Sequence, residues 1–195
     1  MDNMNIPDFI DISSEATNEA LAALEESKGR GPLTPPADCA SYVPKKKMAG
    51  PEGMMDNHVQ EWVESCTVEG AYRDVKRSGN MGMNVRLRIR TTSPTNGNRV
   101  VFGAKYIKPE ELASGKLNPM SLQWLVSLLK ATGMLPPDGA IDARLLNLLF
   151  PPKGQPGAQS PLTGKSVDAS VRQYDNYWNG VLNRKDEVIT FFPGA

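Results

Sequence analysis

Residues 83–90, which read Met-Asn-Val-Arg-Leu-Arg-Ile-Arg, constrain the fold more than any other stretch of the chain. Three aliphatic residues alternate here with three arginines: Val85, Leu87 and Ile89 with Arg86, Arg88 and Arg90. Successive side chains of a β-strand point to opposite faces of the sheet. The pattern therefore predicts a strand with one aliphatic face and one face of guanidinium groups. Such a row needs an anionic partner, an acidic neighbouring strand or open water, and which of these it has bears on function.

Charge is divided unevenly along the chain. The 195 residues carry no net charge, yet residues 1–64 hold 5 Lys and Arg against 12 Asp and Glu, and residues 65–195 hold 17 against 10. This asymmetry is typical of nucleic-acid-binding proteins with an acidic tail, and also of ordinary domains with an acidic disordered leader. We expect a flexible, acidic, largely disordered N-terminal region and linker over residues 1–64, and one folded domain over residues 65–195.

The cysteines and the apolar runs bear on the compartment. Cys39 and Cys66 form neither a CxxC motif nor a disulfide framework, which favours a reducing, cytoplasmic location. No apolar stretch reaches the length of a membrane span, and the N-terminus lacks the basic and apolar regions of a secretory signal. We therefore expect no membrane partner.

Periodicity and turn residues divide the rest of the chain into elements. Strands are expected at 67–76, 83–92, 99–108, 165–174 and 186–192. Helices are expected at 118–133, where Asn118 and Pro119 precede an i, i+3, i+4 apolar pattern, and at 142–149. In the acidic region, short helices are expected after Ser13 or Ser14 and after Asp56.

This order of elements predicts the fold class. Three strands, a helical insertion and two further strands are the order of the OB-fold, a five-stranded Greek-key barrel with a helix between strands three and four. The prediction is mainly β with helices, and a β-sandwich and a split α+β fold are the alternatives. Gly70 and Gly103, in the first and third strands, suit a strongly bent barrel. The exposed edges of such a barrel leave homo-oligomerisation open.

Six short sequence segments follow one another in an order that is also found in a known protein family. They are Val-Glu-Gly-Ala-Tyr-Arg-Asp-Val (68–75), Val-Arg-Leu-Arg-Ile (85–89), Asn-Arg-Val-Val-Phe (98–102), Leu-Lys-Ala-Thr-Gly-Met (129–134), Leu-Thr-Gly-Lys-Ser-Val (162–167) and Val-Ile-Thr-Phe-Phe-Pro (188–193). Over about two-thirds of the chain, they resemble the phage single-stranded DNA-binding proteins of the OB-fold type, including a family long catalogued only as phage proteins of unknown function.

The resemblance implies a function and a set of partners. It implies sequence-tolerant binding of single-stranded DNA, which protects or organises the strand in phage replication or recombination, in the cytoplasm of the host cell. Several proteins of this type carry an acidic C-terminal tail, whereas this chain ends Phe-Phe-Pro-Gly-Ala and is acidic at its N-terminus. Contacts with replication or recombination proteins are therefore expected through residues 1–27, which are also candidates to compete with DNA for the basic groove.

Single strands are held by a basic groove that follows the backbone and by aromatic side chains that stack on bases. The candidate basic residues are Lys76, Arg77, Arg86, Arg88, Arg90, Arg99, Lys105, Arg172, Arg184 and Lys185. The candidate stacking residues are Tyr174, Tyr177 and Trp178, expected in the loop between the fourth and fifth strands, which borders the ligand groove of an OB-fold.

Other residues of these types have plainer interpretations. Aromatic residues suit half-buried strands, so Tyr72 and Tyr106 are interpreted as core or barrel-rim residues, and Trp62 and Trp124 as packing residues. Glu69 and Asp74 stand in the strand next to the arginine row. If they pair with Arg86 or Arg88, part of the row is structural, and Arg90 and residues 174–178 carry more of the binding.

Catalytic motifs are scarce. His58 is the only histidine, and the sequence has no Walker loop, GxSxG, HExxH or metal-spaced His/Cys set. We expect a binding protein rather than an enzyme, with no cofactor and no metal. The alternatives are a protein–protein adaptor whose OB-like barrel binds an acidic partner, and an RNA-binding or strand-annealing protein.

Overall fold

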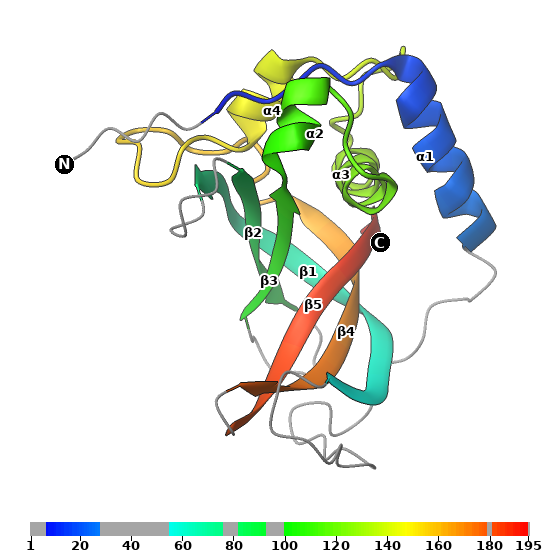
Figure 1. The fold of residues 1–195 in the computed structure, drawn as a ribbon, viewed down its shortest axis with the longest axis vertical. Helices are drawn as coiled ribbons and strands as arrows, with labels where there is room; N and C mark the ends of the chain where they lie inside the picture. Colours follow the sequence, from blue (N-terminus) through cyan, green and yellow to red (C-terminus); the bar gives the residue numbers. More distant parts are fainter. Residues whose placement is uncertain (1–6, 28–54, 76–81, 93–99, 179–180, 195) are drawn as a thin grey trace.

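A computed structural model describes residues 7–27, 55–75, 82–92, 100–178 and 181–194 (Figure 1). Its centre is a five-stranded antiparallel sheet of order β3-β2-β1-β4-β5, with helices toward one end. The elements are α1 (Ser14–Ser27), β1 (Met55–Val75), β2 (Met83–Thr91), β3 (Val100–Ile107), α2 (Pro109–Ser114), α3 (Pro119–Ala131), α4 (Ala143–Leu149), β4 (Ser166–Trp178) and β5 (Val181–Pro193). The expected class, mainly β with helices, is confirmed. Across the described ranges, no helix is long and apolar enough to cross a membrane.

Strand β1 is long and central, and it joins the two parts of the sheet. Its residues 66–75 pair with β2, and its residues 55–67 pair with β4. The sequence pattern predicts this strand only from Thr67 and places a short helix after Asp56. Both predictions are wrong, because the strand already begins at Met55.

The burial pattern of β1 explains the error. Trp62, Glu64 and Cys66 are each almost fully buried and alternate with more exposed neighbours, which is the two-residue period of a strand. The i, i+3, i+4 spacing of Val59, Trp62 and Val63 is therefore not a helical stripe. The expected boundary between residues 64 and 65 falls inside β1 and does not separate two packing units.

The sheet bends until its two edge strands lie close together. Irregular register near Gly70, between β1 and β2, and near Val171, between β4 and β5, marks bulges, which bend strands and increase their twist. Figure 1 shows β3 and β5 side by side, and Lys105 Nζ lies 3.7 Å from Glu187 Oε1 across the gap between them. Among the described residues the two edges share no backbone ladder, so the sheet is curved but not closed.

Helix α3 packs against the core face of the sheet through Trp124. Asn118 caps this helix as predicted, and its Oδ1 accepts a hydrogen bond from Ser121 N at 2.9 Å. The Trp124 ring meets Phe191 of β5 edge to face, with 5.4 Å between centroids. A Cβ at Gly103 of β3 would lie 2.9 Å from Trp124 Cζ2, so close packing of the helix on the sheet requires glycine there.

The short helix α2, which the sequence pattern does not predict, links β3 to α3. The carboxylate of Glu111 accepts hydrogen bonds from Lys108 N at 2.7 Å, Asn118 N at 2.6 Å and Asn118 Nδ2 at 2.7 Å. Burial alone raises the pKa of Glu111, but these hydrogen bonds lower it more, so the net pKa lies below its ordinary value. Glu111 thereby ties the start of α2 to the start of α3.

Residues 7–27 belong to the folded unit. Phe9, Ile12 and Ala20 are buried in the same hydrophobic core as the sheet. Ile12 and Ile141 exchange two backbone hydrogen bonds of 2.8 and 2.9 Å, and α1 packs on α3. The expectation of a largely disordered leader does not hold for this segment, because its few apolar side chains are enough to dock it. Residues 28–54, the expected linker, lie outside the described residues.

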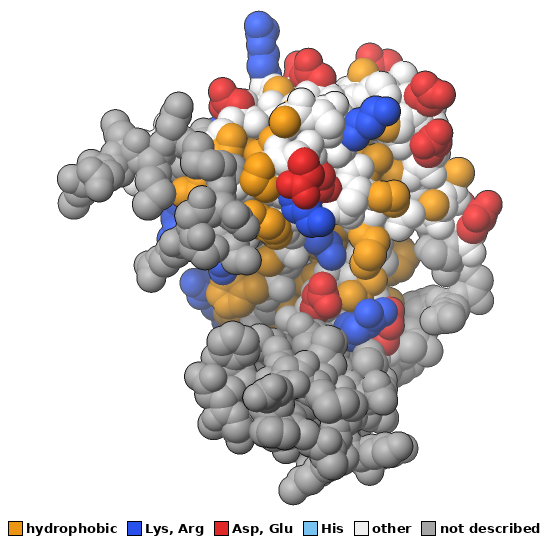
Figure 2. All heavy atoms as spheres, in the orientation of Figure 1, with side chains coloured by type: hydrophobic (Ala, Val, Ile, Leu, Met, Phe, Trp, Pro, Cys, Tyr) orange, Lys and Arg blue, Asp and Glu red, His pale blue; other side chains and the backbone are white. Residues whose placement is uncertain are grey.

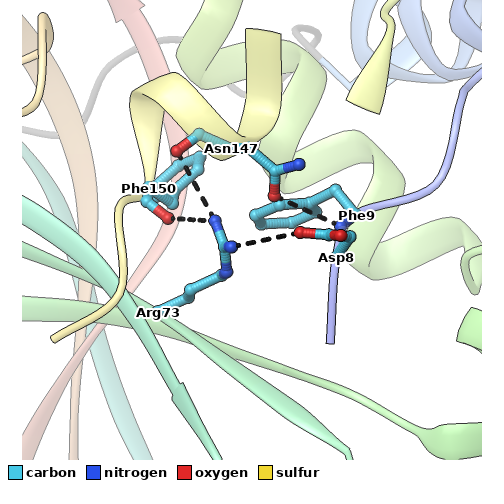
Figure 3. A network of polar contacts seen from close by, with 5 residues as sticks. All are labelled: Asp8, Phe9, Arg73, Asn147 and Phe150. Carbon is cyan, nitrogen blue, oxygen red and sulfur yellow. Dashed lines mark hydrogen bonds and ion pairs between the residues drawn. The ribbon is translucent and has the colours of Figure 1, made fainter. Parts of the chain in front are cut away.

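A buried arginine fastens the N-terminal segment to β1 (Figure 3). Arg73 lies on the core face of β1, and its Nη1 donates to the carbonyl oxygens of Phe150 at 2.9 Å and Asn147 at 3.5 Å. Its Nη2 lies 3.4 Å from Asp8 Oδ1, and its guanidinium stands over the Phe9 ring. Burial lowers the pKa of Arg73, and the charge of Asp8 opposes this effect. Arg73 is therefore a structural cation, distinct from the arginine row.

Candidate nucleic-acid interface

The alternation that the sequence predicts for β2 is present in the structure. Val85, Leu87 and Ile89 are at most 2% exposed and form part of the core. The side chains of Arg86, Arg88 and Arg90 point to the other side and are 44%, 49% and 38% exposed. The three guanidinium groups therefore form a row on the outer face of the sheet.

The strand register places particular residues beside each arginine. Directly paired residues of neighbouring strands share a face of the sheet. The pairs are Arg86 with Tyr72 and Ala104, Arg88 with Gly70 and Phe102, and Arg90 with Thr67 and Val100. We call this side of β1, β2 and β3, with Arg86, Arg88, Arg90, Tyr72 and Phe102, the arginine face.

Phe102 is a residue of this face that the sequence interpretation misses. Its side chain is 50% exposed and lies opposite Arg88. The third strand is apolar on both sides, so its composition does not say which residues face outward. Gly103 indicates the orientation of the strand. It lies under Trp124 of α3 and so faces the core, and its neighbour Phe102 must then face solvent.

Two carboxylates of β1 neutralise part of the arginine row. Glu69 lies in the bulge of β1, and its carboxylate is hydrogen-bonded to Nε of Arg88 at 2.7 Å and also to Nε of Arg90. Asp74 Oδ1 lies 3.8 Å from Arg86 Nε. Arg90 is therefore paired like the other two, contrary to the expectation that pairing leaves it as the freer cation.

The ion pairs also affect the titration of Glu69. The side-chain hydrogen bond from Arg90 has the largest effect and lowers the pKa of Glu69 below its ordinary value. Desolvation opposes this lowering, and Arg88 adds to it. Glu69 is therefore ionised at neutral pH and holds two of the three arginines.

Two further predicted basic residues lie away from the row. Lys105 is opposite buried Val85, on the core face of β3, and only 15% of its side chain is exposed, so its placement on a binding face is wrong. Arg172 lies on the outer face of β4, opposite Glu61, with 3.3 Å between Nη2 and Oε2. Glu61 is six residues along β1 from Thr67, the partner of Arg90, or about 20 Å of strand.

The predicted aromatic cluster lies in a hairpin rather than in a loop. Strand β4 continues to Trp178 and β5 begins at Val181, so Tyr174 and Tyr177 are strand residues. The sequence pattern predicts an earlier end of β4, at Tyr174, because polar residues surround these aromatics. The side chains of Tyr174, Tyr177, Trp178, Arg184 and Lys185 lie outside the described residues, as do Lys76, Arg77 and Arg99 entirely.

The other aromatic residues divide into packing and surface positions. Trp62 and Trp124 are almost fully buried, which confirms them as packing residues. Tyr106 is partly buried, and its hydroxyl lies against Gly82. Tyr72, half-buried at the rim of the arginine face, has Lys153 Nζ 5.7 Å from its ring centroid. By register, Tyr72 is opposite Arg86, and Tyr106 follows Ala104 on the same side of β3, so both tyrosines border the arginine row.

The acidic N-terminal helix lies apart from the arginine face. Helix α1 packs on α3, which covers the core side of the sheet, whereas the row points to the outer side. Its exposed carboxylates include Glu15, Glu19 and Glu26, and Figure 2 shows acidic side chains along this helical end of the molecule. As placed here, residues 7–27 do not cover the arginine row.

Neither metal-ligating residues nor a match to a known protein indicates the function of the site. In the part of the chain that the structure describes, no group of three or more His, Cys, Asp or Glu residues is placed to hold a metal ion. Compared with known proteins, the chain matches no family model and no curated protein. The arginine face is therefore the candidate site that the described residues define.

Proposed function

We propose that the protein binds single-stranded DNA without strong sequence preference, through the arginine face. The observation that carries the proposal is the pairing of exposed Phe102 with Arg88, in a row with Arg86 and Arg90. Guanidinium groups bind phosphate oxygens, and an exposed aromatic ring stacks on any base because every base has a π-face. Both terms of single-strand binding therefore occur within one patch.

The arrangement of the strands supports the same proposal. The order β4-β1-β2-β3 is that of a Greek key, and the helices α2, α3 and α4 come between β3 and β4. With β3 and β5 near each other, this arrangement agrees with a partly open OB-type barrel. Oligonucleotides bind such barrels on the face of strands two and three, which here is the arginine face.

The proposal fits the expected biological role. A sequence-tolerant binder coats exposed strands and protects or organises them during replication or recombination, as the resemblance to phage proteins implies. Binding by stacking and ion pairing requires no cofactor. Phosphates would replace Glu69 and Asp74 as partners of the arginines, so that DNA binding exchanges ion pairs rather than filling an empty basic groove.

Substitution of Phe102 tests the stacking contact. We expect F102A to weaken binding of a fluorescein-labelled oligo(dT) about 5- to 150-fold, since stacking on an aromatic side chain contributes about 1–3 kcal/mol per base. The matched control is M120A, which removes a 72% exposed apolar side chain from α3, away from the sheet. Fluorescence anisotropy at low salt measures both. Equal affinities of F102A and M120A would refute the role of Phe102.

An adaptor that binds an acidic protein is the second candidate. The observation in its favour is that the row's three arginines already face two carboxylates, Glu69 and Asp74, which leaves a local charge of only +1. Partners of a nearly neutral, mixed face with an exposed aromatic are often proteins. A poly-glutamate peptide that displaces oligo(dT) and binds as tightly as the DNA would favour this candidate.

A further inference from the structure

Glu69 occupies an unusual place in the sheet. The register of β1 and β2 passes from the pair Val68–Ile89 to the pair Gly70–Arg88, so Glu69 is the extra residue of a bulge. Its side chain lies on the outer side, where one carboxylate oxygen accepts from Arg88 Nε and the other from Arg90 Nε. One carboxylate thus bridges two guanidinium groups of the arginine face.

This bridge has the chemistry of a phosphate site. A carboxylate and a phosphate both present two anionic acceptor oxygens that match the donors of arginine, and such charge-assisted hydrogen bonds are strong. The contact is closer than that of Asp74, whose oxygen is 3.8 Å from Arg86. Arg88 and Arg90 therefore form an anion site that is filled by the protein's own side chain.

The surroundings leave room for the carboxylate to be replaced. A Cβ built at Gly70 would meet no atom within 4 Å, so the surface beside Glu69 and opposite Arg88 is open. The side chains of Arg88 and Glu69 are 49% and 27% exposed. Exposed ion pairs contribute little net stability, so an incoming phosphate can exchange with them.

We propose that Glu69 is an intramolecular competitor of DNA, which holds Arg88 and Arg90 until phosphates of a single strand displace it. This inference rests on the proposed function, because it names what sets the affinity of the same face. The carboxylate lowers the affinity of the face for DNA, and it also keeps the two arginines from binding other anions.

Neutralising Glu69 is the direct test. We expect E69Q to bind a fluorescein-labelled oligo(dT) about 3- to 10-fold more tightly than the wild type, because two exposed ion pairs no longer compete. The control is E61Q, which removes the same charge from the same strand but releases Arg172, away from the row.

The outcomes separate this inference from the proposed function. Tighter binding by E69Q than by E61Q supports the competitor role. Unchanged or weaker binding by E69Q, or equal tightening by E61Q, overturns the competitor role. The F102A variant tests the proposed function independently of that result. If neither the wild type nor E69Q binds oligo(dT) at low salt, both the proposed function and the inference fail.

A second measurement uses the wild-type chain and does not depend on how a variant folds. The side-chain carboxyl resonance of Glu69 is followed by nuclear magnetic resonance through a pH titration, with and without saturating oligo(dT). If phosphates replace the carboxylate, Glu69 loses its arginine partners and gains a negative neighbour, so its pKa rises when DNA is bound. A pKa that does not change on saturation would contradict the displacement.

Discussion

Two acidic side chains, Glu69 and Glu111, make contacts of different kinds. Glu69 is partly exposed and accepts from two guanidinium groups on the outer face of the sheet. Glu111 is buried and accepts from backbone and side-chain nitrogens between α2 and α3. If Glu69 competes with DNA as proposed, a phosphate replaces the first contact, whereas the second contact ties the starts of two helices together and contributes to stability.

Glu111 gives the fold a defined dependence on pH. Its pKa in the folded chain lies below the ordinary value of 4.5, so its stabilising effect is complete above pH 4.5 and is lost as pH falls through the folded pKa. We expect E111Q to be less stable than the wild type near pH 7 by roughly 1–3 kcal/mol, since hydrogen bonds to a charged group are lost.

Urea denaturation between about pH 7 and pH 3 measures the difference. The difference in stability between E111Q and the wild type should shrink below about pH 4.5, because residue 111 becomes protonated there only in the wild type. E110Q is the control, since Glu110 is exposed and paired with Lys108 at 3.8 Å. A constant difference between E111Q and the wild type over the whole pH range would contradict the assignment.

At the scale of elements, the sequence predicts what local chemistry determines. The alternation in β2 and the helices expected from residues 118 and 142 depend on near neighbours, and these predictions are confirmed. The start of β1 depends on pairing with the distant strand β4. Met55 to Glu64 therefore gives no local strand signal, and a pattern of three apolar residues is read with the wrong period.

The contact between β3 and α3 is specified by one glycine. We expect G103A to destabilise the fold by about 1–3 kcal/mol, because the new methyl group would press on the Trp124 ring in a packed core. G70A is the matched control, since a Cβ at Gly70 meets nothing within 4 Å. Urea denaturation of both variants measures the effect. Equal free energies of unfolding for G103A and G70A would show that α3 can move away from β3 without loss of stability.

At the scale of the whole molecule, the charge split along the sequence does not become a split between two bodies. Residues 7–27 supply acidic charge, but Phe9 and Ile12 place them in the same core as the sheet. Deleting residues 1–27 would therefore remove part of that core and confound any test of competition with DNA. The described part of the leader lies on the helical side, away from the arginine face.

The arginine face is only partly predictable from the sequence. The arginine row follows from a two-residue period, which is local. The partners of that row follow from strand register, which brings Glu69 from 19 residues and Phe102 from 14 residues away to Arg88. Register depends on the bulge in β1 and on the packing of Trp124 over Gly103, and neither can be deduced from the residues of β2 alone.

As proposed, the arginine face binds single-stranded DNA through phosphate contacts and stacking. An anisotropy titration of the full chain with oligo(dT) at about 50 mM and about 200 mM salt tests it most directly. Three phosphate contacts, at a slope of about −0.7 each, predict affinity that falls roughly 15- to 20-fold between the two conditions. Absence of binding at the lower salt concentration, or an affinity that salt does not change, would contradict the account.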